Sequence, residues 1–247
     1  MKKRKKVLAI IPARGGSKSI PKKNIYLILG KPLIFFTIEA AKRAKLIDRI
    51  IVSTDSAEIA EVAKKCGAEV PFLRPRKLSG DKTPDLPVFQ HTLMWLKEKE
   101  DYTPDLVVHL WPTSPLRDPK DIDKAIKNIF SKPEADSIRS ITTPSQVPFK
   151  MWTINKKGSL APIMKSTFKE IYKKGLEPHS MPRQLLPKTF VQTGYLSVIR
   201  PKTIMGKNSM HGEIIIPFLH DPALYTEFDS LKDLFHTEYN LKKYFKS

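Results

Sequence analysis

The chain has 247 residues and a formal net charge of +19, from 44 Lys and Arg against 25 Asp and Glu. With 40% hydrophobic and 28% charged residues it has the composition of an ordinary folded protein, and its length fits one large α/β domain rather than a disordered chain. The single cysteine, Cys66, excludes an intramolecular disulfide, and no apolar run is long enough to span a membrane. Because residues 1–6 do not form a signal peptide, we expect a cytoplasmic protein without a membrane partner.

Strand and helix patterns alternate along the first half of the chain. Four short apolar runs predict buried strands over Lys6–Ile11, Arg49–Ser53, Leu106–Leu110 and Asp136–Ile141. Helical patterns between and after them cover Pro32–Ala44, Ser56–Lys65, Leu86–Lys99 and Pro119–Phe130. This order predicts an α/β fold, with a mainly parallel twisted sheet and helices on both faces.

The alternation stops after about Thr143, and the stretch from Pro144 to Lys188 is interrupted by prolines. Two apolar runs joined by N-K-K-G predict a hairpin there, Met151–Ile154 with Leu160–Ile163. We interpret residues 144–188 as an excursion from a single domain over residues 1–247, which either covers the site or forms an oligomer interface. The main fold is expected to resume at Phe190–Ile199. A strand at Glu213–Ile216 and a final helix from Ser230 onward are expected to follow.

The most informative segment is Ile10–Asn24, I-I-P-A-R-G-G-S-K-S-I-P-K-K-N, directly after the first predicted strand. Gly15 and Gly16 lack a Cβ, so the chain is expected to turn there through backbone angles closed to other residues and to bring N–H groups against an anion. The segment also offers a triphosphate a set of charged and hydroxyl donors, Arg14, Ser17, Lys18, Lys22 and Lys23. It is neither a Walker A loop nor G-x-G-x-x-G. A basic surface loop is the alternative, but cations directly after a strand favour phosphate binding.

Two segments after the second predicted strand carry further polar groups. Asp55 in V-S-T-D-S lies between that strand and a helix, where it acts as a helix cap or contacts a ligand. The stretch Arg74–Asp81, R-P-R-K-L-S-G-D, is an exposed loop or a nucleotide contact made through Arg74.

Two later segments complete the candidate site. Trp111–Arg117, W-P-T-S-P-L-R, places hydroxyl and guanidinium donors at the carboxyl end of a strand, where ligands bind in such sheets, although a structural turn is an equal alternative. Glu227 and Asp229 in T-E-F-D face the same way in an extended segment and could share a divalent cation. Acids at the start of a helix are the alternative.

The net charge of +19 also raises the possibility of nucleic-acid binding. The lysines are spread along the chain, however, and no helix-turn-helix, RNP or zinc-finger pattern is present. We therefore expect no nucleic-acid partner, and keep a basic nucleic-acid-binding protein as the non-enzyme alternative.

Taken together, the motifs resemble those of the acylneuraminate cytidylyltransferases, the CMP-sialic acid synthetase group, over nearly the whole chain. The matching motifs follow the family's order: I-P-A-R-G-G-S-K-S-I-P-K-K-N, G-K-P-L-I, V-S-T-D-S, R-P-x-x-L-S-x-D and P-T-S-P-L-R. Arg183-Gln184, T-G-Y-L and E-F-D match more weakly.

The resemblance implies a Rossmann-like nucleotidyltransferase that joins CTP to a 2-keto sugar acid with Mg²⁺, releases pyrophosphate and forms a homodimer. Catalytic roles are implied for Arg14 and Lys23. Nucleotide contacts are implied for Ala13, Arg14, Gly15, Gly16, Ser17, Lys18, Asn24, Arg74 and Asp81. Acceptor contacts are implied for Trp111, Thr113, Ser114, Arg117, Arg183, Gln184 and Thr193, and Mg²⁺ ligation for Glu227 and Asp229.

The chain departs from the family pattern at three positions. Trp111 stands where Gln is usual, Thr193 where Asn is usual and Glu227 where Asp is usual. Trp replaces an amide with a large ring whose one hydrogen-bonding group is a donor. We therefore expect the acceptor to be a modified nonulosonate or another sugar acid rather than N-acetylneuraminic acid. The alternative enzyme uses another nucleotide or sugar, in the manner of a CMP-KDO synthetase or a guanylyltransferase.

Overall fold

The computed structural model describes residues 4–173 and 175–245, which divide into two compact units. Unit 1 contains the residues up to Ser140 and those from Gln192, and unit 2 contains Ile141–Val191. Each unit has its own apolar core. None of the helices within the described ranges is long and apolar enough to cross a lipid bilayer.

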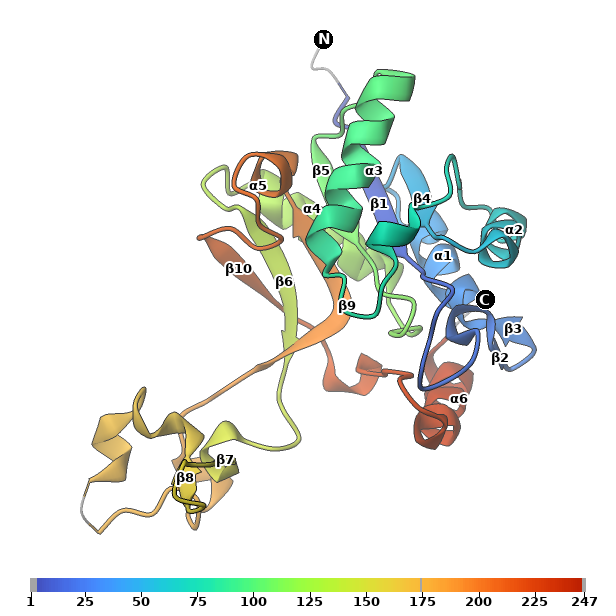
Figure 1. The fold of residues 1–247 in the computed structure, drawn as a ribbon. Coiled ribbons are helices and arrows are strands. Elements are labelled where there is room, and N and C mark those ends of the chain that lie inside the picture. The colour runs from blue at the N-terminus through green and yellow to red at the C-terminus, as the bar shows by residue number, and fades with distance from the viewer. Residues whose placement is uncertain (1–3, 174, 246–247) are drawn as a thin grey trace. The chain divides into compact units, whose positions relative to one another are not determined.

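A six-stranded sheet in the order β10-β6-β9-β5-β1-β4 forms the centre of unit 1 (Figure 1). Its strands are β1 (Val7–Pro12), β4 (Arg49–Ser53), β5 (Leu106–His109), β6 (Ser137–Thr142), β9 (Val191–Ile199) and β10 (Ile215–Leu219). β1 pairs in parallel with β4 and β5, so that Ile10 lies between Ile51 and His109. β9 runs antiparallel to β5. The expected mainly parallel α/β sheet is therefore confirmed, and it contains an antiparallel strand.

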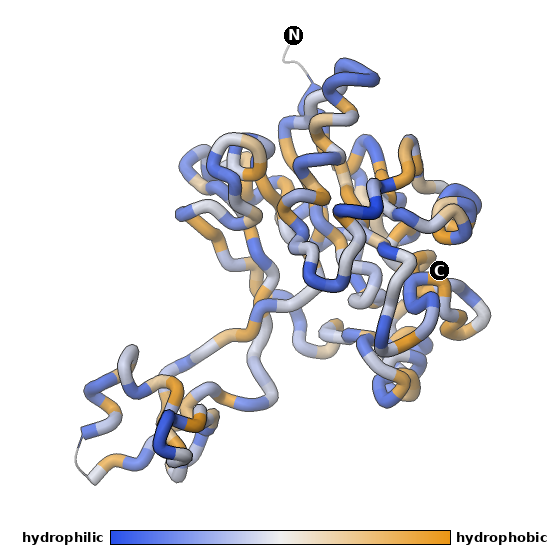
Figure 2. The backbone as a smooth tube through the Cα atoms, viewed as in Figure 1, coloured by the Kyte–Doolittle hydropathy of each residue, from blue (hydrophilic) through white to orange (hydrophobic). Residues whose placement is uncertain are grey.

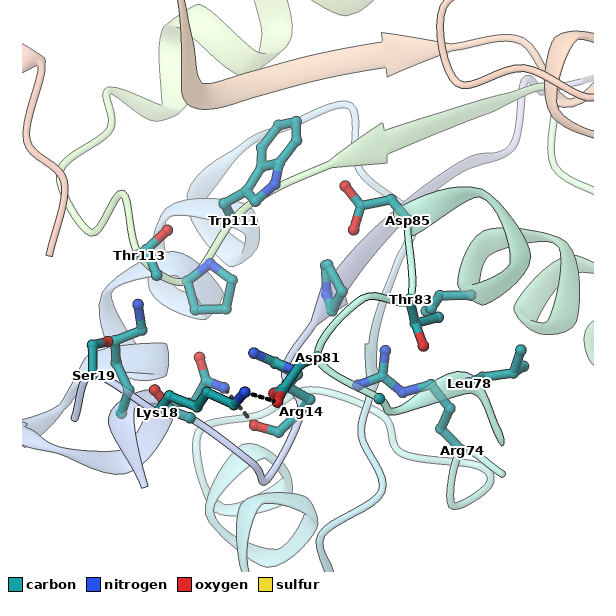
Figure 3. A pocket seen from close by; sticks show the side chains of 17 residues that line it. Arg14, Lys18, Ser19, Arg74, Leu78, Asp81, Thr83, Asp85, Trp111 and Thr113 are labelled. Carbon is teal, nitrogen blue, oxygen red and sulfur yellow. Dashed lines mark hydrogen bonds and ion pairs between the residues drawn. The ribbon is translucent and has the colours of Figure 1, made fainter. Parts of the chain in front are cut away.

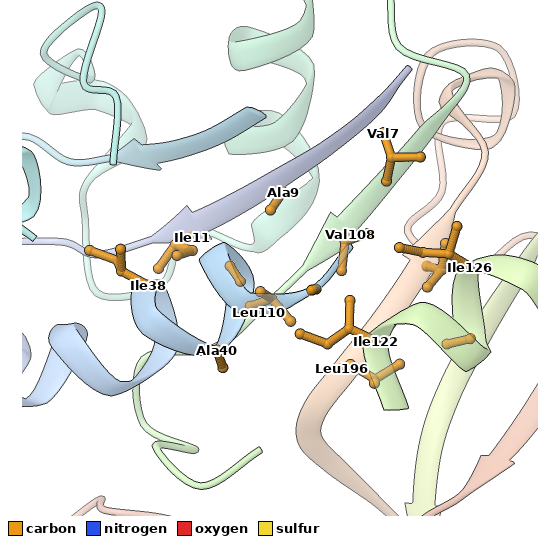
Figure 4. Packing of buried hydrophobic residues seen from close by; sticks show 14 of the residues in the cluster. Val7, Ala9, Ile11, Ile38, Ala40, Val108, Leu110, Ile122, Ile126 and Leu196 are labelled. Atoms are coloured by element: carbon orange, nitrogen blue, oxygen red, sulfur yellow. The ribbon is translucent and has the colours of Figure 1, made fainter. Parts of the chain in front are cut away.

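Helices cover both faces of this sheet because successive residues of each strand point to opposite sides. Val7, Ala9 and Ile11 pack with helices on one face (Figure 4), namely α1 (Leu33–Arg43), α2 (Ala57–Lys65) and α4 (Pro119–Phe130). Leu8 and Ile10 pack on the other face with α3 (Asp85–Glu100) and α5 (Pro201–Met205). Hydrophobic residues follow the central strands in Figure 2, and each fully buried Leu or Ile contributes about 2 kcal/mol.

The remaining elements are a final helix, two short strand pairs and several 3-10 helices. In unit 1 they include the antiparallel pair β2 (Leu27–Ile28) and β3 (Lys31–Pro32), and the final helix α6 (Leu234–Tyr244). In unit 2, β7 (Trp152–Ile154) and β8 (Leu160–Pro162) form the expected hairpin. The 3-10 helices are Lys23–Ile25, Arg76–Leu78, Pro148–Lys150, Ile163–Lys165, Lys169–Tyr172, Arg183–Leu185, Pro222–Leu224 and Leu231–Asp233.

The last third of unit 1 differs from the sequence-based prediction in two places. The strand expected at Glu213–Ile216 begins at Ile215, because the Asp136 carboxylate accepts the backbone N–H groups of Glu213 and Ile214 at 2.8 and 3.2 Å. The helix expected from Ser230 begins with a 3-10 turn, in which Ser230 and Asp233 form a capping box. Both differences arise from contacts between side chains and backbone, which hydrophobic periodicity does not report.

Candidate functional site

A cavity of about 410 Å³ lies at the carboxyl ends of β1 and β5. Three segments form its wall, the loop after β1, the loop that leads into α3 and the loop after β5 (Figure 3). Nine of the predicted site residues line it, namely Arg14, Ser17, Lys18, Lys23, Asn24, Arg74, Asp81, Trp111 and Thr113. The chain thus gathers residues from separate motifs around one polar space, which is large enough for a small ligand.

Close packing, rather than an unusual backbone angle, explains Gly15 in the loop after β1. A Cβ on Gly15 would lie 3.0 Å from Cβ of Ser56, closer than side chains normally approach. Neither Gly15 nor Gly16 has φ in the left-handed region. The prediction that the chain turns there through backbone angles closed to other residues is therefore wrong. The backbone N–H of Gly15 donates to Oδ1 of Asp55 at 2.8 Å, and Ser56, not Asp55, caps α2. Asp55 therefore holds the loop beside the start of α2.

Three cations of this segment, Arg14, Lys18 and Lys23, are paired with aspartates of other segments, and Lys22 is paired with Glu58. Asp81 accepts from Nη1 of Arg14 and pairs with Nζ of Lys18, both at 2.7 Å (Figure 3). The hydrogen bond from Lys18, and after it the bond from Arg14, lowers the pKa of Asp81 below its ordinary value. Lys23 donates from Nζ to Oδ1 of Asp229 at 2.9 Å. Three positive charges thus converge on the cavity, each paired with a carboxylate.

Asn24 and Arg74 have different surroundings at the wall of the cavity. Asn24 donates from Nδ2 to the carbonyl of Arg14 at 2.9 Å and so fixes the loop after β1. The side chain of Arg74 is 4% exposed, and its Nε and Nη2 have no hydrogen-bond partner among the described residues. Its nearest ion-pair partner is Asp55, 3.9 Å away, and burial lowers its pKa. Arg74 therefore has donors left for a ligand.

The side chain of Arg117 forms hydrogen bonds within the protein and does not line the cavity. Its buried guanidinium donates to the carbonyl of Tyr195, to Oγ1 of Thr37 at 2.8 Å, and to the carbonyls of Trp111 and Gly194 at 2.5 and 3.0 Å. Burial lowers its pKa to about 9. Because these bonds use its donors and it does not line the cavity, Arg117 acts here as a clamp that fixes the loop after β5.

The segment 226–229 is attached to the same loop. The N–H of Phe228 donates to the carbonyl of Thr113 at 2.7 Å, and Oε1 of Glu227 accepts from the N–H of Gly194 at 3.1 Å. Glu227 and Asp229 lie outside the residues that line the cavity, although Asp229 contacts Lys23. Within residues 4–173 and 175–245, no group of three or more His, Cys, Asp or Glu is arranged to hold a metal ion.

A protein-family model described as cytidylyltransferase matches residues 8–194, which span all three loops of the cavity. The chain belongs to the cytidylyltransferase family.

Two bacterial proteins are similar to this chain. The chain is 41% identical over 155 residues to a CMP-N,N'-diacetyllegionaminic acid synthase of Legionella pneumophila, covering 63% of this chain and 66% of that protein. It is 46% identical over 119 residues to a pseudaminic acid cytidylyltransferase of Campylobacter jejuni, covering 48% and 50%. The matches thus span between half and two thirds of the length of these curated relatives.

A solved structure described as CMP:2-keto-3-deoxy-manno-octonic acid synthetase complexed with CTP shares the fold. It superposes with a TM-score of 0.70 at 14% identity and covers 96% of this chain and 99% of that chain. At this identity the likeness shows the fold alone, and it agrees with the Rossmann-like nucleotidyltransferase architecture predicted from the sequence.

Several residues predicted for the site are not among the residues that line the cavity. Ala13 is buried and bonded to the strand partner Ser53, and Thr193 is buried against Ser140. Ser114 is buried, with a hydroxyl that has no partner among the described residues. Arg183 and Gln184 belong to unit 2, where Arg183 donates to the carbonyl of Pro144 at 2.5 Å. The acceptor contacts assigned by resemblance therefore stay predictions.

The cavity also contains residues that sequence reasoning missed, above all Ser19, Thr83 and Asp85. Asp85 is the first residue of α3 and faces Trp111 across the cavity (Figure 3). Burial raises its pKa above the ordinary value for a carboxyl group. A signal was present in the sequence, because an acid directly after a Pro, at the end of a motif-bearing loop, marks a helix start near the ligand edge of the sheet.

Proposed function

We propose that this chain transfers CMP from CTP to the anomeric hydroxyl of a nonulosonic or related 2-keto sugar acid and releases pyrophosphate. The observation that carries the proposal is the convergence of Arg14, Lys18 and Lys23 on one cavity at the carboxyl ends of β1 and β5. The names of the two bacterial relatives, a legionaminic acid synthase and a pseudaminic acid cytidylyltransferase, support this substrate class.

The proposed reaction needs in-line positioning and charge neutralisation rather than a covalent protein intermediate. The oxygen of the sugar hydroxyl forms a bond to the α-phosphorus and the hydroxyl proton passes to solvent. The bond from the α-phosphorus to the bridging oxygen breaks, and that oxygen leaves with the pyrophosphate. Arg14, Lys18 and Lys23 would exchange their aspartate partners for phosphate oxygens and neutralise the departing charge. Arg74 would donate to the nucleotide from its unpaired nitrogens.

Mg²⁺ is part of the proposal, with Glu227 and Asp229 as its protein ligands. Both residues supply carboxylate oxygens, which this cation prefers, and Asp229 already contacts the phosphate-loop Lys23. The bound cation would supply charge stabilisation to the departing pyrophosphate.

For the acceptor, we propose a modified nonulosonate or another sugar acid. Trp111 supports this because it occupies the cavity wall with a large ring where related enzymes present an amide. A clear preference for N-acetylneuraminate over every analogue would refute this part.

Pyrophosphate release measured over a grid of CTP, GTP, UTP and ATP with several sugar acids tests the proposal. We expect release with CTP and a sugar acid together, and with neither alone. Fastest release with another triphosphate would favour the alternative nucleotidylyltransferase. Tight binding of duplex DNA, with no pyrophosphate release in any well, would favour the nucleic-acid-binding alternative.

We further propose that the enzyme is a cytoplasmic homodimer without nucleic-acid or membrane partners. The family resemblance is the support for the dimer, with unit 2 as part of its interface. Light scattering after size-exclusion chromatography measures the mass in solution, and a monomer at micromolar concentration would contradict it.

A further inference from the structure

A second cavity, of about 610 Å³, adjoins the candidate nucleotide site in unit 1. Thr83 and Asp85 line both spaces, so the two cavities meet at the start of α3. The other lining residues of the second cavity are Pro84, Leu86, Arg139, Asn208, Ser209, Met210 and His211. A ligand that extends from the first cavity past Asp85 would enter this space.

Arg139 of β6 brings a buried positive charge to the second cavity. The residue is 7% exposed, and its Nη1 donates to Oγ of Ser197 at 2.7 Å. Nη2 lies 3.2 Å from Nε2 of His211, which must accept because a guanidinium only donates. The guanidinium carbon lies 5.5 Å from the ring centroid of Trp111, and Nε has no partner among the described residues.

The charge of Arg139 is not neutralised by a nearby carboxylate. No Asp or Glu oxygen among the described residues forms an ion pair with Arg139 within 4.0 Å, in contrast to Arg14 with Asp81. The negative charge of Asp85 acts on Arg139 from beyond ion-pair distance and raises its pKa, against the larger lowering effect of burial. A buried cation whose partners are a hydroxyl, an imidazole and an aromatic ring is costly unless an anion joins it.

The partners of Arg139 are held in place independently of any ligand. Oδ2 of Asp136 accepts from Nζ of Lys207 at 2.9 Å and from the backbone N–H of Glu213 at 2.8 Å. The hydroxyl of Ser137 donates to the carbonyl of His211 at 2.6 Å. The loop that carries His211 is therefore fixed to β6, and the guanidinium is preorganised rather than free to swing.

We propose that Arg139 binds the carboxylate of the acceptor sugar acid in this second cavity, an inference that rests on the proposed function. A guanidinium fork matches a carboxylate, and one buried cation matches one negative charge, whereas the triphosphate meets several cations in the first cavity. In a 2-keto sugar acid the carboxylate is bonded to the anomeric carbon. Fixing it therefore also positions the attacking hydroxyl. The ring of Trp111, against the same guanidinium, belongs to this acceptor site.

The test compares the best acceptor of the substrate grid with its C1 amide, which keeps the sugar but lacks the negative charge. In the wild type we expect kcat/KM to be about 100-fold higher for the acid than for the amide, and in Arg139→Met we expect this ratio to fall close to one. The dissociation constant for CTP, measured by calorimetry, should stay within about twofold of the wild type, since the two cavities have separate cations. Arg49→Met, at an arginine paired with Glu69 and Glu100 outside both cavities, should keep the wild-type ratio.

The outcomes distinguish failure of the proposed function from failure of the role proposed for Arg139. No pyrophosphate release by the wild type with CTP and any sugar acid removes the proposed function itself. Two outcomes remove the role of Arg139 but leave the proposed function. In the first, the wild type releases pyrophosphate equally well with the acid and the amide. In the second, Arg139→Met still prefers the acid as strongly as the wild type does. If Arg139→Met shows no cooperative thermal unfolding transition and so has lost its fold, His211→Asn replaces it, because His211 accepts from the guanidinium of Arg139. A ratio of kcat/KM for the acid and the amide that is unchanged in His211→Asn overturns the inference.

Discussion

Nζ of Lys23 donates to Oδ1 of Asp229 at 2.9 Å, across 206 positions of the sequence. The lysine side chain is 15% exposed and the aspartate 63%, so the pair lies at the rim of the cavity with its cation inward. This contact links the predicted phosphate loop to the predicted metal segment. The two motifs therefore lie side by side in the folded chain.

Lys23→Ala is expected to lower the turnover number by at least about 100-fold, because it removes a charge that we propose stabilises the departing pyrophosphate. The midpoint of thermal unfolding should change little, since the lost ion pair is partly exposed. The measurement is pyrophosphate release, with the thermal midpoint recorded on the same preparation.

A matched control for that variant is Lys124→Ala. Lys124 donates to Asp121 at the same distance of 2.9 Å, but lies on α4 outside the cavity, and its loss should leave turnover unchanged. Near-normal turnover in Lys23→Ala would remove Lys23 from the phosphate site.

Glu227→Gln is expected to raise the Mg²⁺ concentration for half-maximal activity about tenfold, because it removes one negative charge from the proposed metal ligands. Gln can still accept from the N–H of Gly194 and contact the Tyr225 hydroxyl, so the fold should survive. A Mg²⁺ titration of pyrophosphate release measures this, with Glu61→Gln on the exposed side of α2 as control. Identical titration curves for wild type and Glu227→Gln would exclude Glu227 as a ligand.

The nucleotide half of the site was predictable from sequence because its residues follow one another along a single loop. Arg14, Ser17, Lys18 and Lys23 all lie within eleven positions after β1, so predicting the strand also places the donors. The second cavity was not predictable in this way. Arg139, His211 and Asp85 come from three distant segments, and only the folded sheet brings them together.

The role of Arg117 shows a second limit of sequence reasoning. An arginine in the loop after β5 suggests a side chain that donates hydrogen bonds to a substrate. In the structure the guanidinium of Arg117 is buried and donates instead to the carbonyls of Trp111, Gly194 and Tyr195. Residue type and spacing are the same for a ligand contact and a structural clamp. Burial and the direction of the side chain separate the two, and neither is encoded in the local pattern.

Arg117→Met is expected to lower the free energy of unfolding by about 3 to 4 kcal/mol, because it leaves buried carbonyls without donors. Urea unfolding measures this, and Arg76→Met at an exposed position in the loop before α3 should change it by less than about 0.5 kcal/mol. Wild-type stability combined with a raised KM for either substrate would instead assign Arg117 to substrate binding.

His109→Phe is expected to make the protein less sensitive to acid. The ring of His109 is fully buried between Phe89 and Trp111, neither ring nitrogen has a hydrogen-bond partner among the described residues, and burial holds its pKa well below the ordinary value. In the unfolded chain the pKa is about 6.5, so on acidification the unfolded state takes up the proton first and stability is lost as the pH falls below that value. Between pH 7 and pH 5 the wild type should lose up to about 2 kcal/mol more than the variant, at 1.36 kcal/mol per pH unit. Urea unfolding at several pH values measures the difference, and the other buried histidines cancel because both proteins contain them. Parallel stability curves for the two proteins would show that folding does not lower the pKa of His109.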